Sequence, residues 1–259
     1  KLAMSSVKKF RILKFKSKKP PILSVKGISK SINKVPILKN INLNISKGEL
    51  YGLLGPNGAG KSVTFNCLLG VMKIDQGDIY VEGTKITALP IHERAKRFGI
   101  SYVSQMDSVF RGLSCEDNLR AIAEIIIKDK AKQETIVQEL LSEFNLNHVR
   151  KLKADVLSGG QRKKCIIARA LINSPKLLLL DEPLGAVDPI SIDMIKKIIV
   201  DLQVKRGVSV LITDHNAQNV LSIVDYCSLI VDGEIICNGR PHEIVKDRQA
   251  RKFYFGENW

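Results

Sequence analysis

The sequence predicts an α/β fold in which a mainly parallel β-sheet is covered by helices on both faces. Three observations support this prediction. Short apolar segments with strand character alternate with segments of helical periodicity over most of the chain. A glycine-rich turn joins an apolar strand to a helix near residue 55. Between residues 107 and 156 only amphipathic helices are expected, which indicates a helical insertion in the α/β core.

The composition is that of a globular protein. The chain has 259 residues, of which 44% are hydrophobic and 26% are charged, and this excludes global disorder and a fibrous repeat. No apolar run approaches the about 18 residues of a membrane-spanning helix, and no signal-peptide pattern is visible, so we expect a soluble chain. The five cysteines form no C-x-x-C pair, so we expect reduced thiols in a cytosolic protein.

Positive charge is concentrated at the start of the chain. The formal net charge is +15, and eight Lys or Arg residues lie between Lys1 and Lys19 without any acid among them. The rest of the chain therefore carries a net charge of only +7. A basic arm suits an anionic membrane surface or nucleic acid, although a solvated terminus explains the same charges. We assign residues 1–21 to a basic N-terminal arm.

The expected elements can be placed in order along the chain. Apolar or alternating patterns predict strands over 22–26, 41–45, 49–54, 78–81, 100–103, 177–180, 208–213 and 228–231. Helical patterns follow the glycine-rich turn to about residue 69 and cover 117–127, 135–144, 162–171 and 190–204. We expect one domain over residues 22–243, followed by a tail over 244–259.

The strongest motif is a complete G-x-x-x-x-G-K-S sequence at the glycine-rich turn. Glycines allow backbone N–H groups to surround phosphate oxygens, and the following helix adds its N-terminal dipole. We expect Lys61 to reach the β- and γ-phosphates of a nucleotide and the Ser62 hydroxyl to bind Mg²⁺. A tight turn with a surface lysine is the less favoured alternative. The expected binding residues are Gly55, Pro56, Asn57, Gly58, Ala59, Gly60, Lys61, Ser62 and Val63.

Two acids follow the apolar strand at residues 177–180. Asp181 and Glu182 then lie at the carboxyl edge of the sheet, where α/β proteins bind ligands. We expect Asp181 to hold Mg²⁺ and Glu182 to orient and deprotonate the attacking water. A strand that ends in two acids is a weak signal alone, and the phosphate-binding motif strengthens it.

A second anion-binding motif precedes the helix at residues 162–171. It consists of Ser158, Gly159, Gly160 and Gln161, which would place a serine cap and free backbone amides at a helix start. One nucleotide does not need two such sites within one subunit. Two copies arranged head to tail could instead hold ATP between the phosphate loop of one copy and this segment of the other. A simple helix cap is the alternative reading of the segment alone.

Together these motifs resemble the nucleotide-binding subunits of ABC transporters, in the family's order and spacing, over about residues 22 to 243. The resemblance implies a P-loop NTPase (RecA-like) core with an antiparallel N-terminal β portion and an inserted helical subdomain at about 107–156. It implies hydrolysis of ATP with Mg²⁺ by a head-to-tail homodimer. The motifs that carry it are Gly55–Ser62, Gln105, Leu157–Gln161, Leu177–Glu182, Ala186–Pro189 and His215.

The resemblance also assigns roles to single residues. Gln105 would contact Mg²⁺ and the attacking water and link the core to the helical insertion. Glu182 would be the catalytic base, and His215 would contact both the γ-phosphate and Glu182. Asp188 would bridge the two subunits near the active sites.

Two positions depart from the family pattern. Ile32 stands where many members stack an aromatic ring on adenine, and an aliphatic side chain predicts weaker binding and selection of the base. Val63 stands where many members have a second hydroxyl, so one phosphate contact is expected to be missing. Neither change affects the residues expected around the γ-phosphate.

Three stretches are similar to the ATPase subunits of lipopolysaccharide export systems of Gram-negative bacteria: residues 108–119, residues 186–192 with 212–216, and residues 251–258. In those systems an ATPase dimer powers extraction of lipopolysaccharide from the inner membrane. We therefore expect a cytoplasmic subunit that is peripheral on the inner membrane and bound to transmembrane transporter subunits. The nearest alternative is the ATPase of a branched-chain amino-acid importer. A soluble ABC ATPase acting on nucleic acid or ribosomes is less favoured, because the chain has one cassette and no coiled-coil insertion.

The segment after Gln105 is the expected docking site for the transmembrane subunits, near Asp107, Phe110 and Arg111. Phe110 offers an apolar anchor and Arg111 a charged neighbour, which suits a short partner helix. The alternative is that Phe110 packs under the helical insertion. The basic arm adds an expected contact with anionic lipid.

Overall fold

The computed structural model describes residues 21–106, 108–185 and 187–256, and these residues form two β-sheets with helices around them. The predicted basic arm before residue 21 lies outside the described residues, and so does Asp107.

The larger sheet has six strands in the order β10-β9-β3-β8-β7-β6. Its strands are β3 (Leu50–Leu54), β6 (Ile100–Val103), β7 (Leu177–Asp181), β8 (Ser209–Thr213), β9 (Tyr226–Val231) and β10 (Glu234–Gly239). The first five are parallel, and β10 pairs antiparallel with β9 at one edge. The prediction of a mainly parallel sheet is confirmed.

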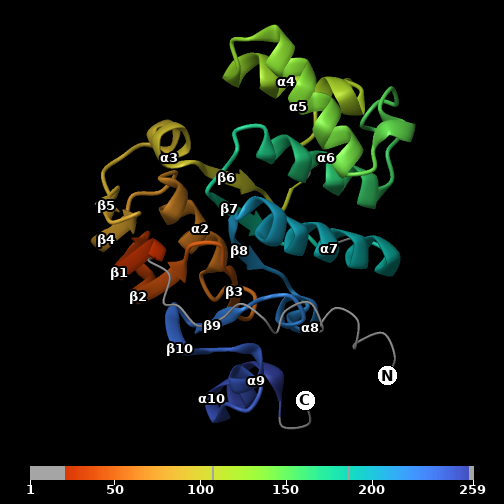
Figure 1. Cartoon of the computed structure of the whole chain (residues 1–259). Helices are drawn as coiled ribbons and strands as arrows, with labels where there is room; N and C mark the ends of the chain where they lie inside the picture. Colours follow the sequence, from red (N-terminus) through yellow and green to blue (C-terminus); the bar gives the residue numbers. More distant parts are fainter. Residues whose placement is uncertain (1–20, 107, 186, 257–259) are drawn as a thin grey trace.

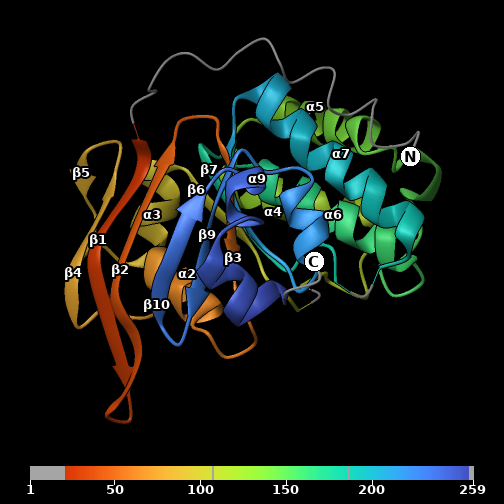
Figure 2. The same cartoon turned by 90° about the horizontal axis from the view of Figure 1, so that it is seen from below.

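The smaller sheet has four antiparallel strands in the order β2-β1-β4-β5. Figure 2 shows β1 and β2 as a long hairpin that extends past the body of the protein. The strands are β1 (Pro21–Ile32), β2 (Val35–Ser46), β4 (Gln76–Val81) and β5 (Thr84–Lys85). This is the antiparallel N-terminal portion expected from the sequence.

The larger sheet separates two hydrophobic cores. Alternate residues of β7 point to opposite sides, so Leu177 and Leu179 join one core and Leu178 and Leu180 join the other. The first core lies between this sheet, α2 and the smaller sheet, and the second contains residues of α4, α5, α6 and α7 (Figure 1). Because both faces are covered, every residue of β7 is buried.

The helices are α2 (Lys61–Leu69), α3 (Ile91–Phe98), α4 (Cys115–Ile126), α5 (Lys130–Glu143), α6 (Gly159–Leu171), α7 (Pro189–Arg206), α8 (Ala217–Leu221), α9 (Pro241–Ile244) and α10 (Arg248–Ala250), with a short 3₁₀ helix η1 (Asn147–Val149) and a short π-helix η2 (Arg251–Phe255).

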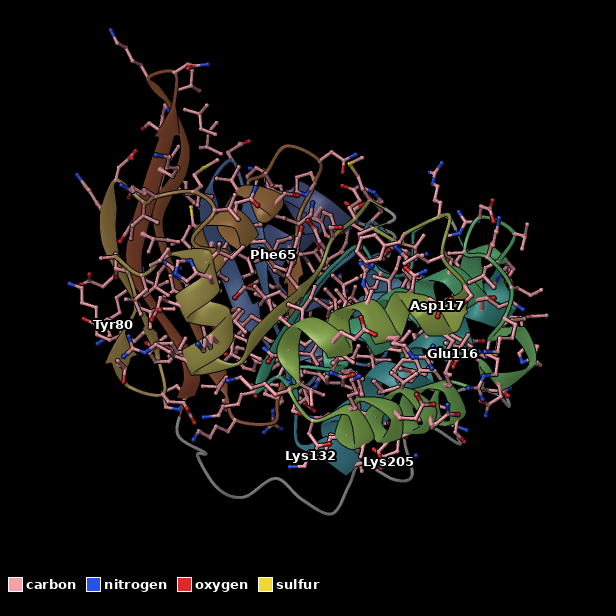
Figure 3. The ribbon with its side chains drawn as sticks, turned by 90° about the horizontal axis from the view of Figure 1, so that it is seen from above. Phe65, Tyr80, Glu116, Asp117, Lys132 and Lys205 are labelled. Carbon is pink, nitrogen blue, oxygen red and sulfur yellow. The ribbon has the colours of Figure 1, made fainter. Side chains whose placement is uncertain are left out.

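A buried acid organises the helical insertion. The carboxylate of Glu116, near the start of α4 (Figure 3), accepts hydrogen bonds from Arg120 and from Arg150, at 2.6 and 2.9 Å. Lys151 forms a third ion pair with it at 2.9 Å. These partners hold the pKa of Glu116 well below its usual range. The cluster therefore ties α4 to the segment that leads into α6.

The observed elements extend beyond several predicted ones. Strand β1 is more than twice as long as expected because the hairpin continues to a tight turn at Asn33 and Lys34, whose φ values of 50° and 66° are left-handed. Helix α5 begins five residues before the expected start, because Asp129 caps it by accepting from the N–H groups of Ala131 and Lys132. Its first turn is exposed, so no apolar periodicity marked it.

No helix among the residues that the structure describes is long and apolar enough to span a membrane.

Candidate active site

The phosphate-binding motif forms a tight loop between β3 and α2, as the sequence predicts. Its shape depends on close backbone approaches. A Cβ atom on Gly55 would lie 2.2 Å from the carbonyl oxygen of Ile230, and one on Gly60 would lie 2.7 Å from Leu38. Gly60 also has a left-handed φ of 107°, which favours glycine at the start of α2. Larger residues would therefore open this loop.

No side chain in the first turn of helix α2 compensates the partial positive charge at its N-terminus. No side chain caps its first turn, and no acid lies in that turn. Ser62 is exposed there, whereas the Lys61 side chain is buried and donates to the carbonyl oxygens of Gly55 and Pro56 at 2.6 and 2.9 Å. Burial lowers the pKa of Lys61, and the nearby carboxylates of Asp181 and Glu182 oppose this shift. Free amides and a cation thus face the same small space.

The remaining residues of the motif frame this space. Asn57 and Gly58 are exposed on the loop, and a Cβ on Gly58 would meet nothing within 4 Å. Ala59 is buried, and Val63 packs against the hydrophobic core beside α2.

Asp181 ends β7 and is held by its two neighbouring strands. The hydroxyl of Thr213 on β8 donates to Oδ1 at 3.0 Å, and the hydroxyl of Tyr102 on β6 donates to Oδ2 at 3.3 Å. Desolvation raises the pKa of Tyr102 to about 12, so its hydroxyl stays protonated at neutral pH. No ion pair to Asp181 exists among the described residues, and the carboxylate is buried.

Glu182 brings the predicted catalytic residues together. Its Oε2 atom accepts a hydrogen bond from Gln105 Nε2 at 2.5 Å, and His215 Nε2 lies 2.5 Å from the same oxygen. The side chain is 7% exposed, and desolvation raises the pKa of its carboxyl despite the opposing effect of His215. Its backbone φ of 52° is left-handed, a conformation that is uncommon outside glycine and concentrates at functional sites.

Sequence analysis missed three residues that support this centre. Besides Tyr102 and Thr213, the buried carboxylate of Asp214 accepts from the N–H groups of Leu184 and Asn216, at 3.0 and 3.1 Å. Burial raises the pKa of Asp214. All three lie near the carboxyl ends of the strands that flank β7. This position at the ligand-binding edge of the sheet is the sequence feature that could have identified them.

The second glycine motif lies at the start of α6, as predicted. Ser158 and Gln161 form a complete capping box, with hydrogen bonds of 3.2 and 3.0 Å between each side chain and the other residue's N–H group. Gly160 packs so closely on α7 that a Cβ would lie 2.2 Å from the Ser191 hydroxyl. Asp188 caps α7 by accepting from the Ser191 N–H at 3.0 Å. Within the described part of the chain, no hydrogen bond joins this segment to the phosphate loop.

The residues present fit a nucleotide and its metal ion. The uncapped start of α2 and the Lys61 ammonium suit phosphate oxygens. Mg²⁺ in proteins is commonly held by one or two side chains together with substrate phosphates, and Asp181 and Ser62 are oxygen donors of this kind. Among the described residues, each oxygen of Asp181 accepts one hydrogen bond, which leaves it a lone pair.

Comparison with protein families matches residues 38–185, more than half of the chain, to the family described as ABC transporter. The chain belongs to the ABC transporter family. With the site described above, it is an ATP-hydrolysing subunit of that family.

Relatives along nearly the whole chain agree with this assignment. The chain is 43% identical to the lipopolysaccharide export system ATP-binding protein LptB of Haemophilus influenzae, over 92% of this chain and 98% of that protein. The LptB protein of Escherichia coli strain K12 is 41% identical with the same coverage of both. A nucleotide-free ATP-binding cassette from an ABC transporter superposes with a TM-score of 0.83 at 29% identity, over 92% of this chain and 100% of the other.

A dimeric ATP-binding cassette bound to ADP and Pi gives a TM-score of 0.75 at 26% identity, over 85% of this chain and 98% of the other. The folds of these ABC cassettes confirm the predicted P-loop architecture.

The C-terminal segment of the ABC cassette lies near His215, the histidine predicted to be catalytic. Tyr254 and Phe255 pack edge to face, with ring centroids 5.0 Å apart. Together with His215 and residues 216–218 they line a shallow cavity of about 450 Å³. The described part of the predicted export-type tail, residues 251–256, therefore lies beside the candidate active site.

A groove runs along the free edge of β6, beside the helical insertion. It has a volume of about 280 Å³ and is mainly apolar, with a wall formed by Ala95, Ile100, Tyr102, Ile122, Ile126 and Ile166. Arg169 also lines it, and its guanidinium lies 5.1 Å from the centre of the Phe110 ring. Phe110 is 46% exposed, whereas the preceding Val109 is buried. Phe110 is thus an exposed ring that contacts Arg169, one of the residues that line the groove, and Arg111 beside it is exposed.

Ile32 lies at the end of β1, next to the hairpin turn, and is partly exposed. Its contact with an adenine base stays a prediction.

Proposed function

We propose that this ABC ATPase powers the extraction of lipopolysaccharide from the inner membrane. The observation that carries this proposal is the similarity to LptB proteins over 98% of their length.

The arrangement of side chains supports a mechanism for hydrolysis. Lys61 and the amides at the start of α2 would bind the phosphates, and Asp181, Ser62 and Gln105 would hold Mg²⁺. When bound, Mg²⁺ neutralises charge that develops on the phosphate oxygens. The Glu182 carboxylate accepts a proton from the attacking water, and its raised pKa improves it as a base near neutral pH. His215 and Gln105 orient this carboxylate from two sides.

We propose a head-to-tail dimer in which each nucleotide is completed by the partner subunit's Ser158 segment. Gly159 and Gly160 carry backbone N–H groups that the capping box leaves free. Because this segment makes no bond to the phosphate loop of its own chain, the second subunit is the available place for a phosphate. Asp188, close to the Ser158 segment through Ser191, is suited to bridge the subunits.

We propose that transmembrane subunits dock in the groove beside β6, with Phe110 and Arg111 at its rim. The apolar wall fits the apolar face of a short helix. In the described residues, Arg169 Nη1 is buried without a hydrogen-bond partner, so an acceptor on the incoming helix would satisfy it. This docking makes the subunit peripheral on the cytoplasmic face of the membrane, and the basic arm would add contact with anionic lipid.

The test is reconstitution with the membrane subunits of the organism's lipopolysaccharide exporter. We expect ATP-dependent release of lipopolysaccharide from proteoliposomes, and Glu182→Gln should abolish it while nucleotide still binds. Phe110→Ala should weaken capture of the membrane subunits at least tenfold without lowering the ATPase rate of the isolated chain. Phe253→Ala removes a ring of similar exposure, 48%, away from the groove and serves as the matched control.

Co-purification with the membrane subunits of an amino-acid importer instead would contradict the export function. Unchanged capture of the exporter subunits by Phe110→Ala would place the docking surface elsewhere.

A further inference from the structure

Tyr102 lies between three parts of the molecule that the proposed mechanism uses separately. Its hydroxyl donates to Oδ2 of Asp181, its ring packs edge to face against Phe65 of α2 with centroids 6.3 Å apart, and the residue lines the groove beside β6. Tyr102 thus contacts Asp181, the phosphate-binding helix and the proposed docking groove together. Tyr102 can do so because β6 is both the neighbour of β7 and the edge strand of the sheet.

The hydrogen bond to Asp181 fixes the direction in which its lone pairs point. Thr213 holds Oδ1 from the other side, so the carboxylate is clamped between hydroxyls from β6 and β8. A ligating carboxylate depends on such partners, whose loss commonly reduces metal affinity by about 10- to 100-fold. The Tyr102 hydroxyl suits this role because it is uncharged and donates its proton to the Asp181 oxygen.

We propose that Tyr102 is a positioning residue that orients Asp181 toward the nucleotide-bound metal ion. Because it also lines the groove, it exposes this contact to the transmembrane subunits that we propose dock there. Its hydroxyl bonds to Asp181, so we expect it to act through that carboxylate. The substitution that isolates this role is Tyr102→Phe, which removes the hydroxyl and retains the ring that packs on Phe65.

The experiment measures metal binding without turnover. The isolated chain is saturated with a non-hydrolysable ATP analogue, and the Mn²⁺ concentration for half-saturation is determined by electron paramagnetic resonance. Tyr102→Phe should raise this concentration about tenfold, at the lower end of the usual range because the bond is long at 3.3 Å. Affinity for the analogue in the presence of a chelator should stay within twofold of the parent protein.

Tyr80→Phe is the matched control. The Tyr80 hydroxyl lies 3.4 Å from an aspartate oxygen of Asp78, but on β4 of the smaller sheet, and Figure 3 shows it at the outer edge of the molecule. This variant should leave Mn²⁺ binding unchanged. Thr213→Val removes the other hydroxyl from Asp181 and should weaken Mn²⁺ binding in the same direction as Tyr102→Phe.

Unchanged Mn²⁺ half-saturation in folded Tyr102→Phe would overturn the proposal. An equal loss of analogue affinity with and without metal would also overturn it, because the residue would then support the site as a whole.

The role of the groove is tested on the complex and rests on the proposed docking. Binding of the membrane subunits should change Mn²⁺ affinity in the parent protein, and Tyr102→Phe should reduce this change by at least half. Co-purification verifies docking separately, so a bound complex with no change in Mn²⁺ affinity would overturn this part alone.

Discussion

The two glycine-rich helix starts of this protein, at α2 and α6, differ in whether side chains cap their backbone N–H groups. Helix α2 has a left-handed glycine as its N-cap, no side-chain cap and no acid in its first turn, and Lys61 lies beside it. Helix α6 begins with Ser158 and Gln161, which satisfy each other's backbone N–H groups. The first start therefore offers several amides and a cation to an anion, and the second offers fewer amides. This difference favours the proposal that the α2 start holds the phosphates within one chain, whereas the α6 start contacts a phosphate held by the partner subunit.

The largest expected effect separates these two roles by mixing variants. Lys61→Ala removes a buried cation from the phosphates and should lower the ATP affinity of the isolated chain about 100-fold. Ser158→Glu places a negative charge at the α6 start and should leave that affinity within twofold while abolishing turnover. A mixture of the two variants should regain turnover, since one composite site of the mixed dimer is intact. ATP binding is followed by equilibrium dialysis and turnover by phosphate release.

If mixed dimers form and no turnover returns, the α6 segment does not serve the partner's nucleotide. The comparison between the two helix starts would then reduce to one binding site and one ordinary helix cap.

An intermediate effect concerns pH, because the proposed base, Glu182, belongs to the same side of the site as the phosphate loop. Desolvation raises the pKa of Glu182 above its ordinary value of 4.5, so this carboxyl stays protonated to a higher pH. A protonated Glu182 cannot accept a proton from water. The turnover of the parent protein should therefore fall on acidification at a higher pH than an ordinary glutamate would give, with rates measured at saturating ATP.

Glu182→Gln should lose about 100-fold or more of the turnover and show no acidic fall assignable to this group. A parent profile that is flat down to pH 4.5 would exclude Glu182 as the base.

The smallest expected effect is on the unfolding free energy, and it is measured by removing two serines that cap helices. Ser158→Ala and Ser114→Ala each remove a hydroxyl that accepts an N–H at a helix start, and each should cost about 1 kcal/mol of unfolding free energy. Thermal denaturation should record a similar small fall for both. Only Ser158→Ala should also reduce turnover, because Ser114 caps α4 within the helical insertion. Equal losses of turnover would mean that the Ser158 hydroxyl acts through stability alone.

Sequence analysis missed helix α3 and strand β10, and each has its own physical reason. Helix α3 is strongly polar, and it is fixed instead by Arg94, whose guanidinium is buried and donates to the carbonyls of Cys67 and Leu68 near the end of α2. Ile91, Ala95 and Phe98 repeat at helical spacing, but this pattern spans only two turns and Ile91 is exposed, so it was overlooked. Strand β10 was missed because its residues are mostly half-exposed at a sheet edge. In contrast, β7 was predicted well because both its faces are buried.

The sequence by itself determined the local motifs. Gly55–Ser62, Asp181 with Glu182, and Ser158–Gln161 each act through neighbours in the chain, so a glycine at a left-handed position or an acid at a strand end can be read directly from the residues. Only the tertiary structure decided which distant side chains meet. Gln105 and His215 converge on one oxygen of Glu182 because β6 and β8 flank β7 and end at the same edge of the sheet. The clamp on Asp181 has the same origin, since strand order places the Tyr102 and Thr213 hydroxyls on opposite sides of it and no local pattern specifies that order.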